Sequence, residues 1–111
     1  MNLSTTEYPN CMIISASGRV DSFTAPRLAE AFQSVMDHGQ YKLVFDMADV
    51  DYISSAGLRV MIDVQKNCKI SNNGELKLVD VPKRVSETLE LAGFVPLFRF
   101  YQGVNSAVDE F

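Results

Sequence analysis

Several features that would suggest a catalyst are scarce or missing in this chain. Its 111 residues include one histidine, His38, and a serine nucleophile normally needs a histidine as its base. His38 stands beside Gly39 at the end of an expected helix, where it is better placed to interact with the negative helix end. No G-x-S-x-G elbow, G-x-x-x-x-G-K-[ST] loop or G-x-G-x-x-G fingerprint occurs. We therefore expect neither a hydrolase nor a nucleotide enzyme, and no enzyme activity.

Signals for secretion, membrane insertion and nucleic-acid binding are missing as well. No apolar run approaches the roughly 18 residues that a membrane span needs, and the start MNLSTTEYPN has no basic or apolar signal region. The net charge is -4 and the basic residues are scattered, which disfavours direct binding of nucleic acid. Cys11 and Cys68 have no metal-binding spacing and suit two buried free thiols in a reducing cytoplasm. We expect a cytoplasmic protein with no membrane span, no metal and no cofactor.

The distribution of apolar residues predicts a single α/β domain over residues 1–111, with hydrophobic residues at 47% and charged residues at 22%. Strands are expected at 3–8, 11–20, 42–47, 75–81 and 97–101. Helices are expected at 24–39, 56–68, 82–93 and 105–111, with Thr24 as a cap and a turn at 72–74. Because strands and helices alternate after an opening hairpin, we expect a mixed, mostly parallel sheet of about five strands with about four helices packed against it.

Candidate core residues recur at helical spacing in these segments. In the first helix the buried stripe is expected to comprise Leu28, Phe32, Val35 and Met36. In the helix at 82–93 the inward residues are expected to be Val85, Leu89 and Ala92. The run KLVFDM is almost unbroken in its apolar character, which favours a central strand covered on both faces.

Two adjacent serines, Ser54 and Ser55, stand where the strand at 42–47 leads into the helix at 56–68. A small hydroxyl residue at this position commonly caps the helix. The unpaired N–H groups and the dipole of a helix start also attract anions, so a phosphoserine would be tolerated there. Arg59 follows Ser55 by one turn, where a cation opposes the dipole unless it serves an anion or a partner. From the residues alone, capping and phosphorylation are open alternatives.

The segment VDYISSAGLRVM strongly resembles the signature of STAS domains, the anti-sigma factor antagonist family of bacteria. The resemblance continues through ASGRVDSFTAPRL and GELKLVDVPKRVSETLELAGFVPLF, so it covers essentially the whole chain. It implies that Ser55, followed by Ala56 and Gly57, is the phosphorylated serine, and that Ser54 is a less favoured acceptor. Many such antagonists have aspartate where this chain has Ser54, and serine or threonine where it has Ala56.

The resemblance also implies partner switching in the regulation of transcription. An anti-sigma factor that is also a serine kinase would bind the unmodified antagonist, release its sigma factor and then phosphorylate the antagonist. A PP2C-type phosphatase would reset the circuit. A STAS scaffold subunit of a transport or signalling complex, never phosphorylated, is the alternative.

The surface that docks the partner is expected at the start of the helix at 56–68, with Leu58 exposed and with Asp49 and Asp51 on the preceding loop. The residues expected to bind the partner are Asp21, Asp49, Asp51, Ser54, Gly57, Leu58 and Arg59. We expect a monomer or a weak dimer, the latter supported by an exposed Phe111.

Overall fold

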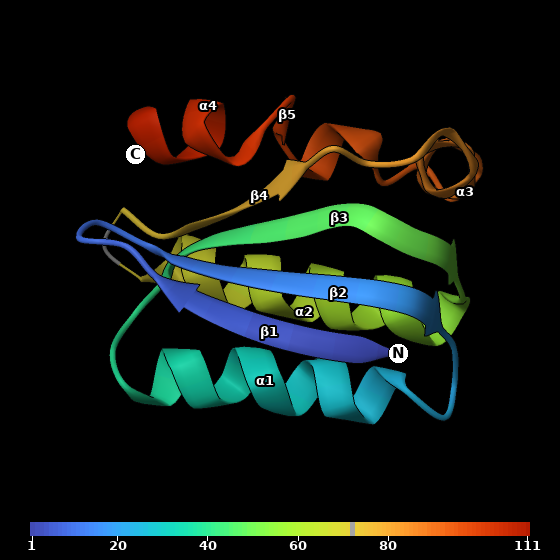
Figure 1. Cartoon of the computed structure of the whole chain (residues 1–111), viewed down its shortest axis with the longest axis horizontal. Helices are drawn as coiled ribbons and strands as arrows, with labels where there is room; N and C mark the ends of the chain where they lie inside the picture. The colour runs from blue at the N-terminus through green and yellow to red at the C-terminus, as the bar shows by residue number, and fades with distance from the viewer. Residues whose placement is uncertain (72) are drawn as a thin grey trace.

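The computed structural model describes residues 1–71 and 73–111, which form a five-stranded sheet with helices packed against it (Figure 1). The strands are β1 (Asn2–Glu7), β2 (Met12–Val20), β3 (Lys42–Ile53), β4 (Glu75–Val79) and β5 (Phe100–Tyr101). The helices are α1 (Ala25–Asp37), α2 (Ser55–Ile70), α3 (Lys83–Leu91) and α4 (Val104–Asp109), with a 3-10 turn η1 at Val95–Leu97. The sheet order is β1-β2-β3-β4-β5; β1 is antiparallel to β2 and the other pairs are parallel, which confirms the predicted α/β fold.

Alternate residues of the central strands build two apolar layers, one on each face of the sheet, because successive strand side chains point to opposite faces. Leu43 and Phe45 of β3 pack with buried residues of α1, α2 and α3. Val44, which lies between them in the sequence, packs on the other face beneath Ala107 and Val108 of α4. Figure 1 accordingly shows α4 and α1 on opposite sides of β3.

The buried stripe predicted for the first helix is confirmed, since Leu28, Phe32, Val35 and Met36 are all buried. Cys11 and Cys68 are both buried and free, and burial raises the pKa of the Cys68 thiol to about 12. None of the helices in the described residues is long and apolar enough to cross a membrane.

Strand β3 is longer than the sequence predicts, continuing to Ile53 instead of ending near residue 47. Its parallel pairing with β2 persists through two register shifts and ends with Val20 opposite Ile53. The prediction that Asp49 and Asp51 lie on a loop was therefore wrong, because both are strand residues. The bulges that make the extension possible depend on pairing with a distant strand, which a local pattern does not reveal.

The last strand is shorter than the predicted segment 97–101, because β5 contains only Phe100 and Tyr101. The side chain of Gln65 occupies the place of the missing strand residues beside β4. Its amide oxygen accepts the Leu76 N–H at 2.8 Å, and its amide nitrogen donates to the Leu76 and Leu97 carbonyls at 3.0 and 2.9 Å. The backbone groups at this edge are thus satisfied without a strand.

Several local expectations also need correction. Thr24 precedes α1, but its hydroxyl makes no cap hydrogen bond to the helix. Ala92 follows the end of α3 and is exposed, whereas Val85 and Leu89 are buried. Phe111 is half-buried, with its ring over the Lys77 ammonium, instead of exposed. In the turn expected at 72–74, Asn72 lies outside the described residues, while Asn73 has a φ of 60°.

Candidate functional site

The start of α2 divides the two serines between different tasks. Ser54 has an extended backbone and is the N-cap, since its hydroxyl oxygen accepts the Gly57 N–H at 3.3 Å. Its own N–H donates to the Val20 carbonyl at 2.8 Å, which ties the cap to the end of β2. Ser55 is the first residue of the helix and is exposed. The capping role thus belongs to Ser54, and the Ser55 hydroxyl faces solvent.

Gly57 brings the start of α2 directly against the ends of two strands. A Cβ atom at this position would lie 2.7 Å from side-chain carbons of Ile53 and of Val20, which is too close for a real contact. Gly57 is consequently buried. Its contribution to any docking surface is therefore indirect: it allows the helix to sit close enough to the sheet for Ser54 to reach Val20.

The loop between β2 and α1 lies at the same end of the sheet and is held by Asp21. One carboxylate oxygen of Asp21 accepts the N–H groups of Phe23 and Thr24 at 3.0 and 3.1 Å. The Thr24 hydroxyl accepts the Asp21 N–H at 2.8 Å. The hydrogen bonds that the carboxylate accepts, the one from the Thr24 N–H first among them, hold the pKa of Asp21 below its usual value. Asp21 therefore fixes the shape of the loop.

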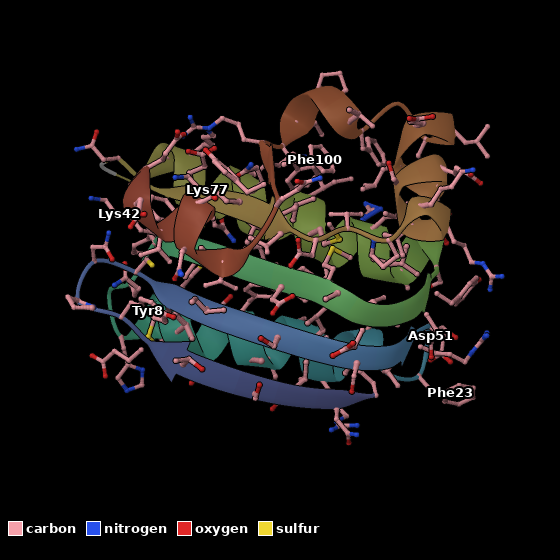
Figure 2. All side chains as sticks on the ribbon, turned by 45° about the horizontal axis from the view of Figure 1, so that its top comes forward. Tyr8, Phe23, Lys42, Asp51, Lys77 and Phe100 are labelled. Carbon is pink, nitrogen blue, oxygen red and sulfur yellow. The ribbon has the colours of Figure 1, made fainter. Side chains whose placement is uncertain are left out.

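Phe23 stands on this loop with 89% of its surface exposed, which is unusual for a large apolar side chain. Figure 2 shows Phe23 and Asp51 at the same end of the molecule. Exposed aromatic side chains on rigid supports commonly anchor protein partners. Phe23 was not among the residues predicted from the sequence, although an aromatic residue in the loop DSFTAP, outside any apolar periodicity, was the available signal.

The remaining predicted residues are spread more widely than expected. Arg59 is exposed one turn into α2 and lines, with Ser55, a hollow of about 440 Å³. Leu58 is only 5% exposed, so the prediction of an exposed Leu58 was wrong, because it faces the core on the inner side of α2. Asp49 and Asp51 are both exposed. Asp51 lies close to the helix start, and Asp49 lies opposite Ser17 of β2 in the strand register. Asp49 lies about 13 Å back along the strand from Ile53, at about 3.3 Å per residue.

The helix start is suited to an anion. Helix α2 has 16 residues and no acidic residue in its first turn, so its unpaired N–H groups and dipole favour a negative charge on Ser55. His38, the single histidine, follows the far end of α1, where its Nδ1 lies 2.8 Å from the Ser34 carbonyl oxygen. That contact confirms the predicted role of His38 at the helix end. It also leaves Ser55 without a histidine base.

Comparison with known proteins extends this picture. The family model of the STAS domain matches residues 2–107. BtrV of Bordetella bronchiseptica, which bears the name anti-sigma factor antagonist, is 35% identical over 111 residues, covering 100% of this chain and 95% of BtrV.

Solved structures share the fold at lower identity. An anti-sigma factor antagonist from Mycobacterium paratuberculosis superimposes with a TM-score of 0.87 at 22% identity, covering 98% of this chain and 92% of that one. SpoIIAA, a Bacillus cell fate determinant, matches at 11% identity with TM-scores of 0.85 for its unphosphorylated form and 0.77 for its phosphorylated form. Each of the two matches covers 98% of this chain. They cover 95% of the unphosphorylated SpoIIAA chain and 98% of the phosphorylated one. With the family model spanning nearly its whole length and a relative of 35% identity among the antagonists, this chain belongs to the STAS domain family of anti-sigma factor antagonists.

Proposed function

We propose that this chain is a cytoplasmic anti-sigma factor antagonist, a regulator and not a catalyst, which phosphorylation of Ser55 switches off. The observation that carries the proposal is the division of labour between the serines. The Ser54 hydroxyl is engaged in the cap bond at the start of the helix. Ser55 is exposed and is therefore accessible to a modifying enzyme. The helix dipole favours a dianion at the first helical residue, and the scaffold does not need to move to accommodate it.

The proposed docking surface surrounds Ser55 and combines direct with indirect contributors. Phe23, Asp51 and Arg59 are exposed and would touch the partner, with Asp49 at the margin and Ser54 beside the acceptor. Asp21, Gly57 and Leu58 would act from beneath, through the shape of the loop and the seating of the helix. Ser54 remains a much weaker acceptor because its hydroxyl is engaged in the cap.

The proposed partner is an anti-sigma factor that is also a serine kinase. Bound to the unmodified chain, it would release its sigma factor and then transfer the terminal phosphoryl group of ATP to Ser55. The bond from Oγ of Ser55 to phosphorus forms, the bond from phosphorus to ADP breaks, and the hydroxyl proton passes to a base of the kinase. A PP2C-type phosphatase would hydrolyse the phosphoserine and restore binding.

The phosphate would act by spoiling the interface. It adds about 1.5 to 2 negative charges to a patch that the partner desolvates and that already contains Asp51. A loss of about 3 kcal/mol in binding corresponds to a factor of about 100 in affinity. The relatives named as antagonists support this mode over an unphosphorylated scaffold subunit.

The test uses Ser55→Asp and Ser55→Ala with the anti-sigma factor encoded in the same genome. We expect Ser55→Asp to weaken binding about 100-fold in calorimetry while the melting temperature changes little. Ser55→Ala should bind well but gain no phosphate by intact mass after incubation with kinase and ATP. Ser106→Asp, an exposed serine in α4, is the matched control and should bind as wild type. Unchanged affinity of Ser55→Asp would favour the scaffold alternative.

A further inference from the structure

A groove runs along one side of α2, beginning at Ser55 and ending near Lys69. It consists of two adjoining hollows of about 440 and 380 Å³, which share Ile62 and Lys66. The opposite wall is formed by the segment 92–99, which begins directly after α3 and contains η1. At 1.5 Å per residue, the stretch of α2 from Ser55 to Lys69 is about 21 Å long. The groove therefore has the length of about four helical turns.

The floor of the groove is apolar. Leu58 and Ile62 supply it from α2, and Phe94, Pro96 and Leu97 supply it from the opposite wall. Leu97 is 46% exposed, which leaves a large apolar side chain uncovered within the groove. Both hollows are partly open to solvent, so the groove suits a segment laid into it more than an enclosed small molecule.

The rim of the groove is cationic, although the chain carries a net charge of -4. Four of the ten basic residues line it, namely Arg59, Lys66, Lys69 and Arg99. Two carboxylates accompany them, Asp63 and Glu75. Arg99 and Glu75 neutralise one another through bonds of 2.8 and 2.6 Å. Lys66 and Lys69, one turn apart on α2, are exposed, and neither forms an ion pair within the described residues.

We infer that this groove binds an acidic amphipathic helical segment of the partner that engages Ser55. Apolar side chains at helical spacing would enter between α2 and the segment 92–99, and carboxylates on the flank would face Lys66 and Lys69. The inference rests on the proposed function for the identity of the partner. It adds that the partner contacts the whole length of α2, and that a phosphate on Ser55 would place negative charge at the mouth of a groove that receives an acidic segment.

The double variant Lys66→Glu, Lys69→Glu tests the groove in the full chain. We expect its affinity for the anti-sigma factor to fall at least about tenfold, because each charge reversal places like charges together. The matched control is Lys83→Glu, Arg84→Glu, which reverses two exposed cations of α3 outside the groove and should change affinity less than about twofold. Melting curves of both variants check that the fold is intact.

Zero-length carbodiimide crosslinking of the wild-type complex, followed by peptide mass spectrometry, gives the second readout. We expect Lys66 or Lys69 to be joined to aspartates or glutamates within one short segment of the anti-sigma factor. Crosslinks confined to Lys42 or Lys83, or a charge-reversed variant that binds as wild type, would overturn the proposal that the partner binds in the groove. Binding of dodecanoate in the groove without any displacement of the partner would also overturn it, since the groove would then be a lipid site.

The two proposals fail in different ways. If Ser55→Asp abolishes binding while the Lys66→Glu, Lys69→Glu variant binds normally, the groove is wrong and the switch stands. If the charge-reversed variant loses affinity while Ser55→Asp binds normally, the groove stands and phosphorylation does not control it.

Discussion

Two regions of this molecule use polar side chains in opposite ways. At the start of α2, Ser54 and Asp21 bond to nearby backbone, and Ser55, Asp51 and Arg59 are left exposed. Around β4, the side chains of Gln65, Glu75 and Lys77 are buried, and each has a partner. The first region leaves polar groups exposed at the surface, and the second uses its polar groups to hold elements of the fold together.

Lys77 is the most extreme residue of the β4 region, because its exposed fraction is 0%. Its ammonium donates to the Ala107 carbonyl at 2.9 Å and lies 3.7 Å from the centre of the Phe111 ring, beneath the C-terminal helix (Figure 2). Burial, followed by the charge of Arg99, lowers the pKa of Lys77. A carbonyl and an aromatic face replace the water that a lysine normally requires.

The contrast teaches where a charge can change without consequence for the fold. A new charge near Ser55 meets solvent and alters a surface. A lost or added polar group near β4 leaves a buried partner unsatisfied. The free energy of unfolding of matched variants measures this contrast.

The largest effect is expected for Gln65→Leu, in the β4 region. It removes the partners of the Leu76 N–H and of the Leu76 and Leu97 carbonyls. We expect a loss of about 3 kcal/mol in the free energy of unfolding, because a buried unsatisfied group costs about 1 to 3 kcal/mol. Urea unfolding provides the measurement. Gln33→Leu, on the exposed face of α1, is the control and should change stability by less than about 0.5 kcal/mol.

A smaller loss of stability is expected for Ser54→Ala, and Ser55→Ala is the variant to compare with it. Ser54 accepts the Gly57 N–H, so its loss should cost about 1 kcal/mol of stability. Ser55→Ala should be nearly neutral, because it replaces an exposed residue with a strong helix former. Chemical denaturation of the two variants side by side checks the difference. Equal destabilisation would show that Ser55 also serves as a cap.

The smallest effect concerns acid pH and the ion pair between Arg99 and Glu75. The hydrogen bonds from Arg99 are the largest cause that lowers the pKa of Glu75, so the ionised carboxylate stabilises the fold above its unfolded pKa near 4.3. That contribution disappears as the pH falls through the lower, folded pKa. Although Glu75 is buried, the Arg99 side chain is 56% exposed and solvent screens the pair, so Arg99→Met should cost no more than about 1 kcal/mol at neutral pH.

The pH profile distinguishes this pair from general destabilisation. The difference in stability between wild type and Arg99→Met should shrink as the pH falls through the lowered, folded pKa of Glu75, below which Glu75 is protonated in both proteins. Arg84→Met, on the exposed face of α3, should show no such convergence. A gap that stayed constant down to acid pH would mean that Arg99 acts through packing alone.

Periodicity predicted the parts of this fold that depend on local pattern. The stripe of α1, the buried thiols and the position of the serines at the start of α2 all follow from residues close in sequence. Contacts between distant segments account for the errors. Strand β3 continues because β2 pairs with it past two register shifts, and β5 is short because Gln65 replaces a strand.

The candidate site was predictable to a similar degree. The resemblance predicted Ser55 as the modified residue, and Ser55 is exposed at the start of α2, but the burial of Leu58 depends on how α2 is rotated against the sheet. The exposure of Phe23 depends on a loop folded around Asp21. The burial of Leu58 and the exposure of Phe23 both depend on how the elements pack, which the local sequence pattern does not reveal.

The close approach at Gly57 bears on how an enzyme would recognise Ser55. The first turn of α2 is pressed on Val20 and Ile53, so Ser55 is held in the helix and is not presented as an extended strand. An enzyme that modified Ser55 would therefore have to take the serine in its helical geometry, together with the neighbouring loop and strand. The substrate is then a folded shape, and a short linear peptide spanning the same residues would lack the features by which it is selected.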